Sequence, residues 1–189
     1  SSVATARVLE QFALPIFEVI TPAVTEALQA STNLNFGIIG TRATISSGIY
    51  EKKILKSQPA ARIHSVACPL LVPLVEEGWL KKRETAMIVK KYLRPLKNRQ
   101  IDTLILGCTH YPLLKNVIQT KIGKRVELID SSICISEGIK HFLDNNRDIE
   151  RQLGQNGNMS LYVSDVTDQF KKIAQLTLKT SITFECVKI

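Results

Sequence analysis

Short apolar runs, rich in β-branched residues, alternate along this chain with segments of helical periodicity. Such alternation is typical of βα units, in which helices cover the faces of a largely parallel sheet. Most of the runs are apolar throughout, as expected for strands that are buried on both faces. We therefore predict an α/β fold with strands at 16–20, 36–39, 63–67, 103–106, 126–129, 161–163 and 182–187.

The segments between these strands carry apolar residues three and four positions apart, which is the spacing of one helix face. We predict helices at 3–12, 24–30, 45–56, 85–96, 113–120, 133–143 and 168–178. Pro22 and Pro112 suit a first helical turn, which needs no backbone donor there. Asp130 offers a capping oxygen to the helix that follows it.

The composition describes a folded chain but does not divide it into domains. Its 189 residues, 44% of them hydrophobic, can bury a sizeable core. The formal net charge is +8, but the lysines and arginines are spread along helical segments, where a solvated face is their usual role. We therefore expect no nucleic-acid partner. We also expect no membrane span and no signal peptide, because no stretch of about 18 apolar residues and no leader-like start occurs.

Four cysteines lie far apart, at positions 68, 108, 134 and 186. They form no Cys-x-x-Cys pair and have few histidines nearby, so we expect no metal site. A chain with this much apolar sequence does not need disulfide bonds for its stability. We therefore expect reduced thiols and a cytoplasmic location.

The segment 101–114, which reads Ile-Asp-Thr-Leu-Ile-Leu-Gly-Cys-Thr-His-Tyr-Pro-Leu-Leu, places a thiol directly after a buried strand. In an open α/β sheet, ligands bind beyond the carboxyl ends of the strands. A helix start and a nearby histidine both lower the pKa of a thiol, and Cys108 has both within a few residues. His110 can hold or relay a proton, and Thr109 can donate a hydrogen bond to a carboxylate. From spacing alone, a buried cysteine that merely fills a turn remains an alternative.

The segment 36–50 has the same order of strand, glycine, hydroxyl residues and helix. It presents Thr41 and Thr44, together with backbone N–H groups, at a helix start. Such a start is a suitable binding site for an anion, including a carboxylate. Ordinary capping of the helix by these threonines is the alternative.

Together the two loops resemble those of the glutamate racemase family, within the aspartate/glutamate racemase superfamily. The family's second catalytic-cysteine motif is matched without a gap by Gly107-Cys108-Thr109-His110-Tyr111-Pro112-Leu113-Leu114. Its substrate-contacting loop and the helix after it are similar to Gly40-Thr41, Thr44 and 47–50. Further stretches typical of the family resemble 68–70, 72–78 and 128–131.

The resemblance implies racemisation of glutamate without a cofactor, which supplies D-glutamate for peptidoglycan. The family uses two cysteines, one on each face of the α-carbon, to remove and deliver the proton. By this resemblance Cys108 is the acid and base on one face, His110 is its partner, and Glu77 is an outer acidic partner of His110. The residues implied in substrate binding are Thr109, His110, Thr41 and Thr44.

The resemblance also implies two α/β lobes that face each other across the active site. Residues 22–130 would form one complete lobe, and residues 1–21 and 131–189 would form an incomplete second lobe. The family's first catalytic cysteine, in a Cys-Asn-Thr-Ala-Ser loop, and its Asp-Ser-Gly and Tyr-Gly loops have no counterpart in this sequence. We therefore expect no racemisation by the 189-residue polypeptide alone. We also expect the incomplete lobe to expose apolar edges that favour homo-oligomers.

Two alternatives stay open. Aspartate racemase, hydantoin racemase and arylmalonate decarboxylase are relatives with similar cysteine loops, so the substrate of this chain could differ from glutamate. A catalytically inactive module that binds a protein or nucleic acid through its basic surface is the second alternative. The missing first cysteine favours that reading, and the intact loop around Cys108 argues against it.

Overall fold

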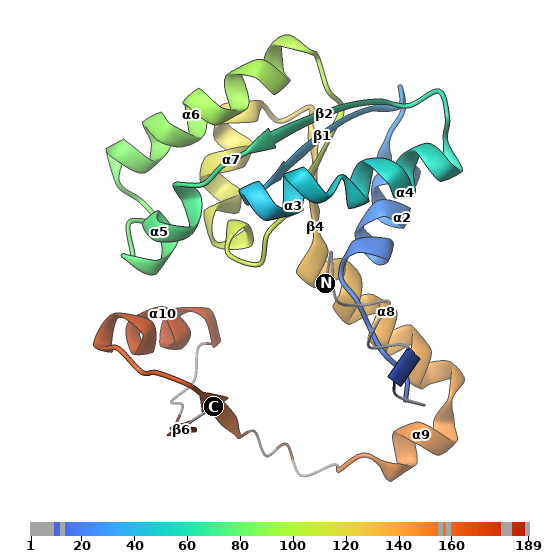
Figure 1. Cartoon of the computed structure of the whole chain (residues 1–189), viewed down its shortest axis with the longest axis vertical. Coiled ribbons are helices and arrows are strands. Elements are labelled where there is room, and N and C mark those ends of the chain that lie inside the picture. The colour runs from blue at the N-terminus through green and yellow to red at the C-terminus, as the bar shows by residue number, and fades with distance from the viewer. Residues whose placement is uncertain (1–9, 12–13, 155–156, 158–159, 179–182, 188–189) are drawn as a thin grey trace.

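Four of the predicted strands form one parallel sheet in a computed structural model that describes residues 10–11, 14–154, 157, 160–178 and 183–187 (Figure 1). The sheet has the order β2-β1-β3-β4. The strands are β1 (Asn35–Gly40), β2 (Arg62–Ala67), β3 (Thr103–Gly107) and β4 (Glu127–Asp130). The prediction of an α/β fold with a parallel sheet is confirmed.

Helices cover both faces of this sheet. The first face carries α5 (Leu71–Glu76), α6 (Arg83–Asn98) and, after the 3₁₀ turn η1 (Tyr111–Leu114), α7 (Lys115–Ile122). The second face carries α2 (Ile20–Ala30), α3 (Arg42–Ser47) and α4 (Ile49–Ser57), with α8 (Ser131–Asn145) packed against α2. Figure 1 shows α6 and α7 on one side of the sheet and α2 and α4 on the other.

The alternation of side chains along the strands explains this sandwich. In β3, Leu104 and Leu106 pack into the core of the first face, while Ile105 between them packs into the core of the second. All three side chains are fully buried. A strand that is apolar at every position is therefore matched to helices on both sides, as the sequence predicted.

The register of the sheet brings two glycines together at its carboxyl edge. Gly40, the last residue of β1, pairs with Gly107, the last residue of β3. From β1 the chain connects to β2 on one side, whereas β3 and β4 extend the sheet on the other side. The loops after β1 and β3 therefore diverge at a topological switch point, which is the usual ligand site of such sheets.

Two predictions in the N-terminal half are wrong for identifiable reasons. Residues 15–18 form no strand, and α2 begins at Ile20. The carboxylate of Glu18 accepts hydrogen bonds from the backbone N–H groups of Ile20 (2.6 Å) and Thr21 (2.8 Å) and thus caps this helix. The helix predicted at 45–56 is divided into α3 and α4, because Gly48 adopts a left-handed conformation with φ of 61°.

The remaining predicted elements lie close to the observed ones or fall partly outside the described residues. The helix predicted at 3–12 falls mostly on residues that are not described. The short helices α5 and α9 (Arg147–Gln152) were not predicted. Near the C-terminus, β5 (Leu161–Val163) and β6 (Phe184–Cys186) pair in parallel, and α10 (Asp168–Leu178) contacts α5. The division into a lobe of residues 22–130 and an incomplete second lobe stays a prediction.

Asp102, just before β3, forms hydrogen bonds with the residues that follow α2. Its substitution tests how much these bonds stabilise the fold. Its carboxylate accepts hydrogen bonds from the Ser31 hydroxyl (2.9 Å) and from the backbone N–H groups of Thr32 (2.8 Å) and Asn33 (2.9 Å). Burial raises the pKa of Asp102, but these hydrogen bonds outweigh it and hold the pKa below its usual value. We expect Asp102→Asn to lower the free energy of unfolding by about 1–2 kcal/mol at neutral pH.

The pH dependence of this loss has a definite sign. Because the pKa of Asp102 is lower in the folded than in the unfolded chain, its stabilisation is present above the unfolded pKa of about 3.9 and is lost as the pH falls through the folded value. Urea unfolding should therefore separate the parent and the variant near pH 7 and bring them together in acid. The exposed carboxylate variant Glu127→Gln serves as the control. An equal difference at both pH values would contradict this assignment.

Candidate active site

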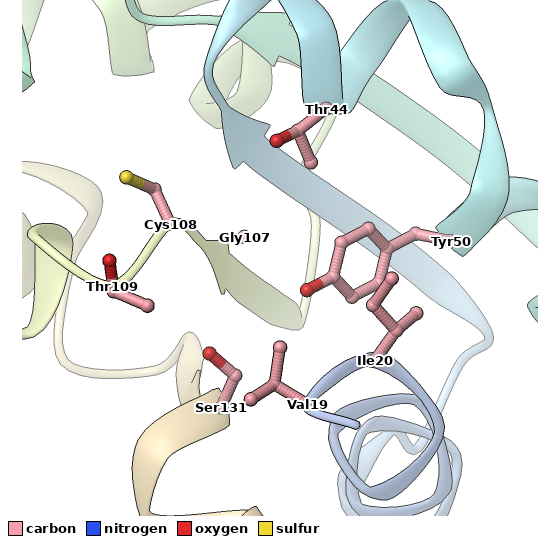
Figure 2. A pocket seen from close by; sticks show the side chains of 8 residues that line it. All are labelled: Val19, Ile20, Thr44, Tyr50, Gly107, Cys108, Thr109 and Ser131. Atoms are coloured by element: carbon pink, nitrogen blue, oxygen red, sulfur yellow. The ribbon is translucent and has the colours of Figure 1, made fainter. Parts of the chain in front are cut away.

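A cavity of about 200 Å³ opens at the carboxyl edge of the sheet, between the loops that follow β1 and β3 (Figure 2). Its lining residues are Val19, Ile20, Thr44, Tyr50, Gly107, Cys108, Thr109 and Ser131. This is the switch point of the sheet, where the sequence predicted a ligand site. The structure thus brings three of the predicted site residues, Thr44, Cys108 and Thr109, to one cavity.

Cys108 is a half-buried thiol in the first position after β3. Burial raises its pKa, and the nearby charge of Glu76 raises it further. Hydrogen bonding to the backbone at His110 and Tyr111 acts in the opposite direction but does not outweigh burial. The expectation that the helix start and His110 give Cys108 a low pKa is therefore wrong for the unliganded chain. Its thiol is protonated at neutral pH.

The imidazole of His110 lies next to an acidic side chain. Its Nε2 atom lies 3.5 Å from Oε1 of Glu76. Glu76, not Glu77, is thus the acidic neighbour, and the expectation for Glu77 is corrected. The side chains of His110 and Glu76 are 36% and 61% exposed, so this pair adds little to stability. Both line a second, larger hollow of about 550 Å³ that reaches Phe170 of α10.

Thr41 and Thr44 have different places in the site. The Thr41 hydroxyl caps α3 by accepting the backbone N–H of Thr44 at 3.2 Å. The two hydroxyl oxygens are also hydrogen-bonded to each other at 3.0 Å. Thr44 lines the cavity, whereas Thr41 is not among its lining residues. The structure confirms that Thr41 caps the helix, whereas the ligand contact expected of the two threonines stays a prediction.

The cavity also contains residues that sequence reasoning did not assign to it. Tyr50 lies in the first turn of α4, and Ser131 is the first residue of α8. Val19 and Ile20 were placed in a strand, although they lead into α2. The available signals were weak: the sequence showed Tyr50 as one position of a predicted helix and Ser131 as the residue after the predicted cap Asp130. Only the packing of α2, α4 and α8 around the ends of β1 and β3 brings them together.

The other three cysteines are not among the residues that line this cavity. Cys68 is fully buried before α5, and its burial raises the pKa to about 12. Cys134 is half-buried within α8, and Cys186 is exposed in β6. Within the described part of the chain, Cys108 therefore supplies the sole thiol that lines the cavity.

The described residues show neither a metal-binding cluster nor a membrane-spanning helix. No cluster of three or more His, Cys, Asp or Glu side chains is arranged there to hold a metal ion. Among the helices of the same residues, none combines the length and the apolar character that a membrane crossing requires.

The negative charge of Glu76 leads to a prediction for the reactivity of Cys108. This charge contributes to raising the pKa of the thiol, so Glu76→Gln should lower that pKa. Alkylation by iodoacetamide should then accelerate about twofold near neutral pH, because the thiolate is the reactive form. Peptide mapping by mass spectrometry separates Cys108 from the other thiols. Glu77→Gln, one residue further on, is the matched control and should leave the rate unchanged. A larger effect of the control would place the acting carboxylate at Glu77 instead.

The fold and the site define an α/β protein with a ligand cavity at the switch point of a parallel sheet and a thiol at its edge. A family model described as Asp/Glu/Hydantoin racemase matches residues 2–135. The chain belongs to this family, and the resemblance drawn from its loops is confirmed. Glutamate racemase of Aquifex aeolicus is 39% identical over 178 residues, which cover 94% of this chain and 65% of that protein.

Solved structures agree with this assignment. The glutamate racemase isoform RacE1 from Bacillus anthracis superposes with a TM-score of 0.89 and 32% identity, covering 100% of this chain and 70% of its own. Glutamate racemase from Francisella tularensis, solved in complex with D-glutamate, gives 0.88 and 32%, with coverage of 99% and 69%. The chain thus spans about two thirds of the length of the relatives that it matches.

Proposed function

We propose that this chain is the part of a glutamate racemase that carries one of its two proton-exchanging thiols. The observation that carries the proposal is the place of Cys108, at the edge of a cavity at the switch point of the sheet and flanked by the hydroxyls of Thr44 and Thr109 (Figure 2). The proposal is supported by relatives named glutamate racemase, at 36–39% identity.

In this proposal Cys108 transfers one proton. As thiolate, its sulfur takes the α-hydrogen of the amino acid as a proton, and the electron pair of the broken C–H bond is delocalised into the α-carboxylate. Return of a proton from the same side restores the starting enantiomer. Delivery of a proton by a second acid on the opposite face inverts the centre. No cofactor takes part in either step as proposed.

The hydroxyl groups and His110 have supporting roles in this proposal. Thr44 and Thr109 donate hydrogen bonds to the carboxylates of glutamate, and Thr41 keeps the Thr44 hydroxyl in place through their hydrogen bond. The imidazole of His110, next to Glu76, exchanges the proton of Cys108 with solvent. The product, D-glutamate, would be used for peptidoglycan. A cytoplasmic setting would keep the four free cysteines reduced.

Proton exchange without inversion is the test of this function. The 189-residue polypeptide is incubated in D₂O with L-glutamate or D-glutamate, and α-deuterium is measured by NMR while chiral chromatography measures inversion. Since one thiol lines the cavity among the described residues, we expect deuterium uptake by one enantiomer and no appreciable inversion. Neither binding nor exchange of either enantiomer would contradict the proposal. Rapid inversion would show that a second acid is already contained in these residues.

A further inference from the structure

Tyr111, the first residue of η1, is fully buried, and its hydroxyl is bound to the chain that follows β2. The hydroxyl donates a hydrogen bond to the backbone carbonyl of Cys68 at 2.9 Å. Burial raises the pKa of Tyr111, as do the nearby charges of Cys68 and Cys108, so the phenol keeps its proton and remains a donor. A buried hydroxyl without a partner would be destabilising, so this bond fixes the position of the ring.

The carbonyl that accepts this bond lies where several elements meet. It also accepts a hydrogen bond from the backbone N–H of Leu71, the first residue of α5, at 3.1 Å. The backbone N–H of Cys68 in turn donates to the carbonyl of Gly40, the last residue of β1, at 2.8 Å. Figure 1 shows β2 leading into α5 at this edge of the sheet. The side chain of Tyr111 therefore joins the chain after β3 to the ends of β1 and β2 and to the first turn of α5.

The backbone of Tyr111 is bound to the loop that carries the thiol. Its N–H group donates to the carbonyl of Cys108 at 3.1 Å. Hydrogen bonding to the backbone at His110 and Tyr111 also favours the thiolate of Cys108 and opposes the effect of burial on its pKa. A residue whose side chain is fixed in the core thus fixes the backbone donors around the sulfur.

The same hydrogen bond joins the two segments that carry the acidic neighbour of the site and its histidine. Glu76 is the last residue of α5, and His110 directly precedes η1. Their side chains approach to 3.5 Å, and α5 and η1 are in contact. Because the hydroxyl of Tyr111 is bound at the start of α5, it holds these two segments in register.

We propose that Tyr111 is the positioning residue of the Cys108 loop (residues 108–110), because its buried hydroxyl ties this loop to the chain after β2. Held in this way, the loop keeps its backbone N–H groups directed at the sulfur and His110 beside Glu76. The part of Tyr111 in proton transfer rests on the function proposed above. Tyr111 is not among the residues that line the cavity, so it acts through Cys108 and not on the amino acid itself.

The test follows the alkylation of Cys108 by iodoacetamide as the pH is varied, in the parent polypeptide and in Tyr111→Phe. The variant removes one oxygen and keeps the ring in the core. We expect alkylation about threefold slower at pH 7, because the donors to the thiolate are less well placed, and equal rates at high pH, where both thiols are ionised. The other titratable groups near the thiol, Glu76, Tyr50 and His110, are the same in both proteins.

Tyr92→Phe on α6 is the matched control. The Tyr92 hydroxyl accepts a hydrogen bond from the backbone N–H of Leu70 at 3.4 Å, so this variant removes a phenolic oxygen from the same chain after β2 without touching residues 108–110. It should keep the alkylation profile of the parent. In the parent itself, a slowly exchanging hydroxyl proton of Tyr111 detected by NMR would support the hydrogen bond without any substitution, and its absence would overturn the proposal even if Tyr111→Phe failed to fold.

The shape of the pH profile separates positioning from a merely structural role. Faster alkylation of Tyr111→Phe at every pH would mean that the hydroxyl only shields the thiol, and this result or an unchanged profile would overturn the proposal. An equal shift in Tyr92→Phe would do the same, because general loosening of the core would then suffice. Measurement of α-deuterium uptake from glutamate keeps the two proposals apart. If the profile shifts as expected but the parent exchanges no α-proton, the positioning of Cys108 stands and the proposed function fails.

Discussion

Replacing Cys108 by serine should reduce the exchange of the α-proton of glutamate about 10²- to 10⁴-fold, the range expected when a general base is removed. Serine keeps the size of the side chain, but its hydroxyl is a far weaker acid and forms no useful alkoxide at neutral pH. Ligand binding should persist, because Thr44 and Thr109 remain in place. Deuterium incorporation measured by NMR at saturating glutamate separates the loss of chemistry from any loss of binding.

The control for this experiment is another free thiol of the same chain. Cys186→Ser changes an exposed cysteine in β6 and should leave the exchange rate as it is. In the parent, the rate should rise with pH and should still be rising above about pH 8.5, because burial raises the pKa of Cys108 above that of an ordinary thiol. Exchange that survives Cys108→Ser would move the catalytic base to another residue.

Replacing Gly107 by alanine should destabilise the fold and disturb the site together. A Cβ atom at this position would lie 2.9 Å from the backbone carbonyl oxygen of Ile39 and 3.2 Å from the ring of Tyr50. A backbone oxygen within a sheet cannot rotate away, so β1 and β3 must move apart where Gly40 pairs with Gly107. We expect a loss near the upper end of the usual range for overpacking, about 3 kcal/mol, measured by urea unfolding. Proton exchange should fall as well, because Cys108 is the next residue.

Gly138 provides a matched substitution of the same kind. It lies inside α8, and a Cβ atom there meets nothing within 4 Å. Gly138→Ala should therefore raise the free energy of unfolding by about 0.5–1 kcal/mol, because alanine is favoured over glycine within a helix. If both variants changed stability in the same direction, steric contact at Gly107 would not be the cause of the loss.

The raised pKa of Cys108 has a consequence for the proposed reaction. A protonated thiol is ready to donate a proton, but it must lose that proton before it can act as a base. The proximity of Glu76, which disfavours the thiolate, fits a resting state in which Cys108 is the acid.

The local amino-acid sequence by itself determined the fold class of this protein and the positions of its site loops. Continuous apolar runs such as that of β3 are stable only when both faces are covered, and this requirement defines an α/β sheet with helices on each side. The same order placed Cys108, and Thr41 with Thr44, directly after strands, where parallel sheets bind ligands. These conclusions depend on neighbours along the chain, and local periodicity is sufficient to reach them.

The tertiary structure alone decided which side chains share the cavity and how they are charged. Tyr50, Ser131 and Ile20 come from three helices, and only the packing of those helices on the sheet brings them to Cys108. The direction of the thiol pKa also depends on burial, which the sequence around Cys108 does not reveal. The choice of Glu76 over Glu77 depends on the direction in which one short helix ends. Side-chain direction and desolvation are properties of three-dimensional packing, and the spacing of residues along the chain does not determine them.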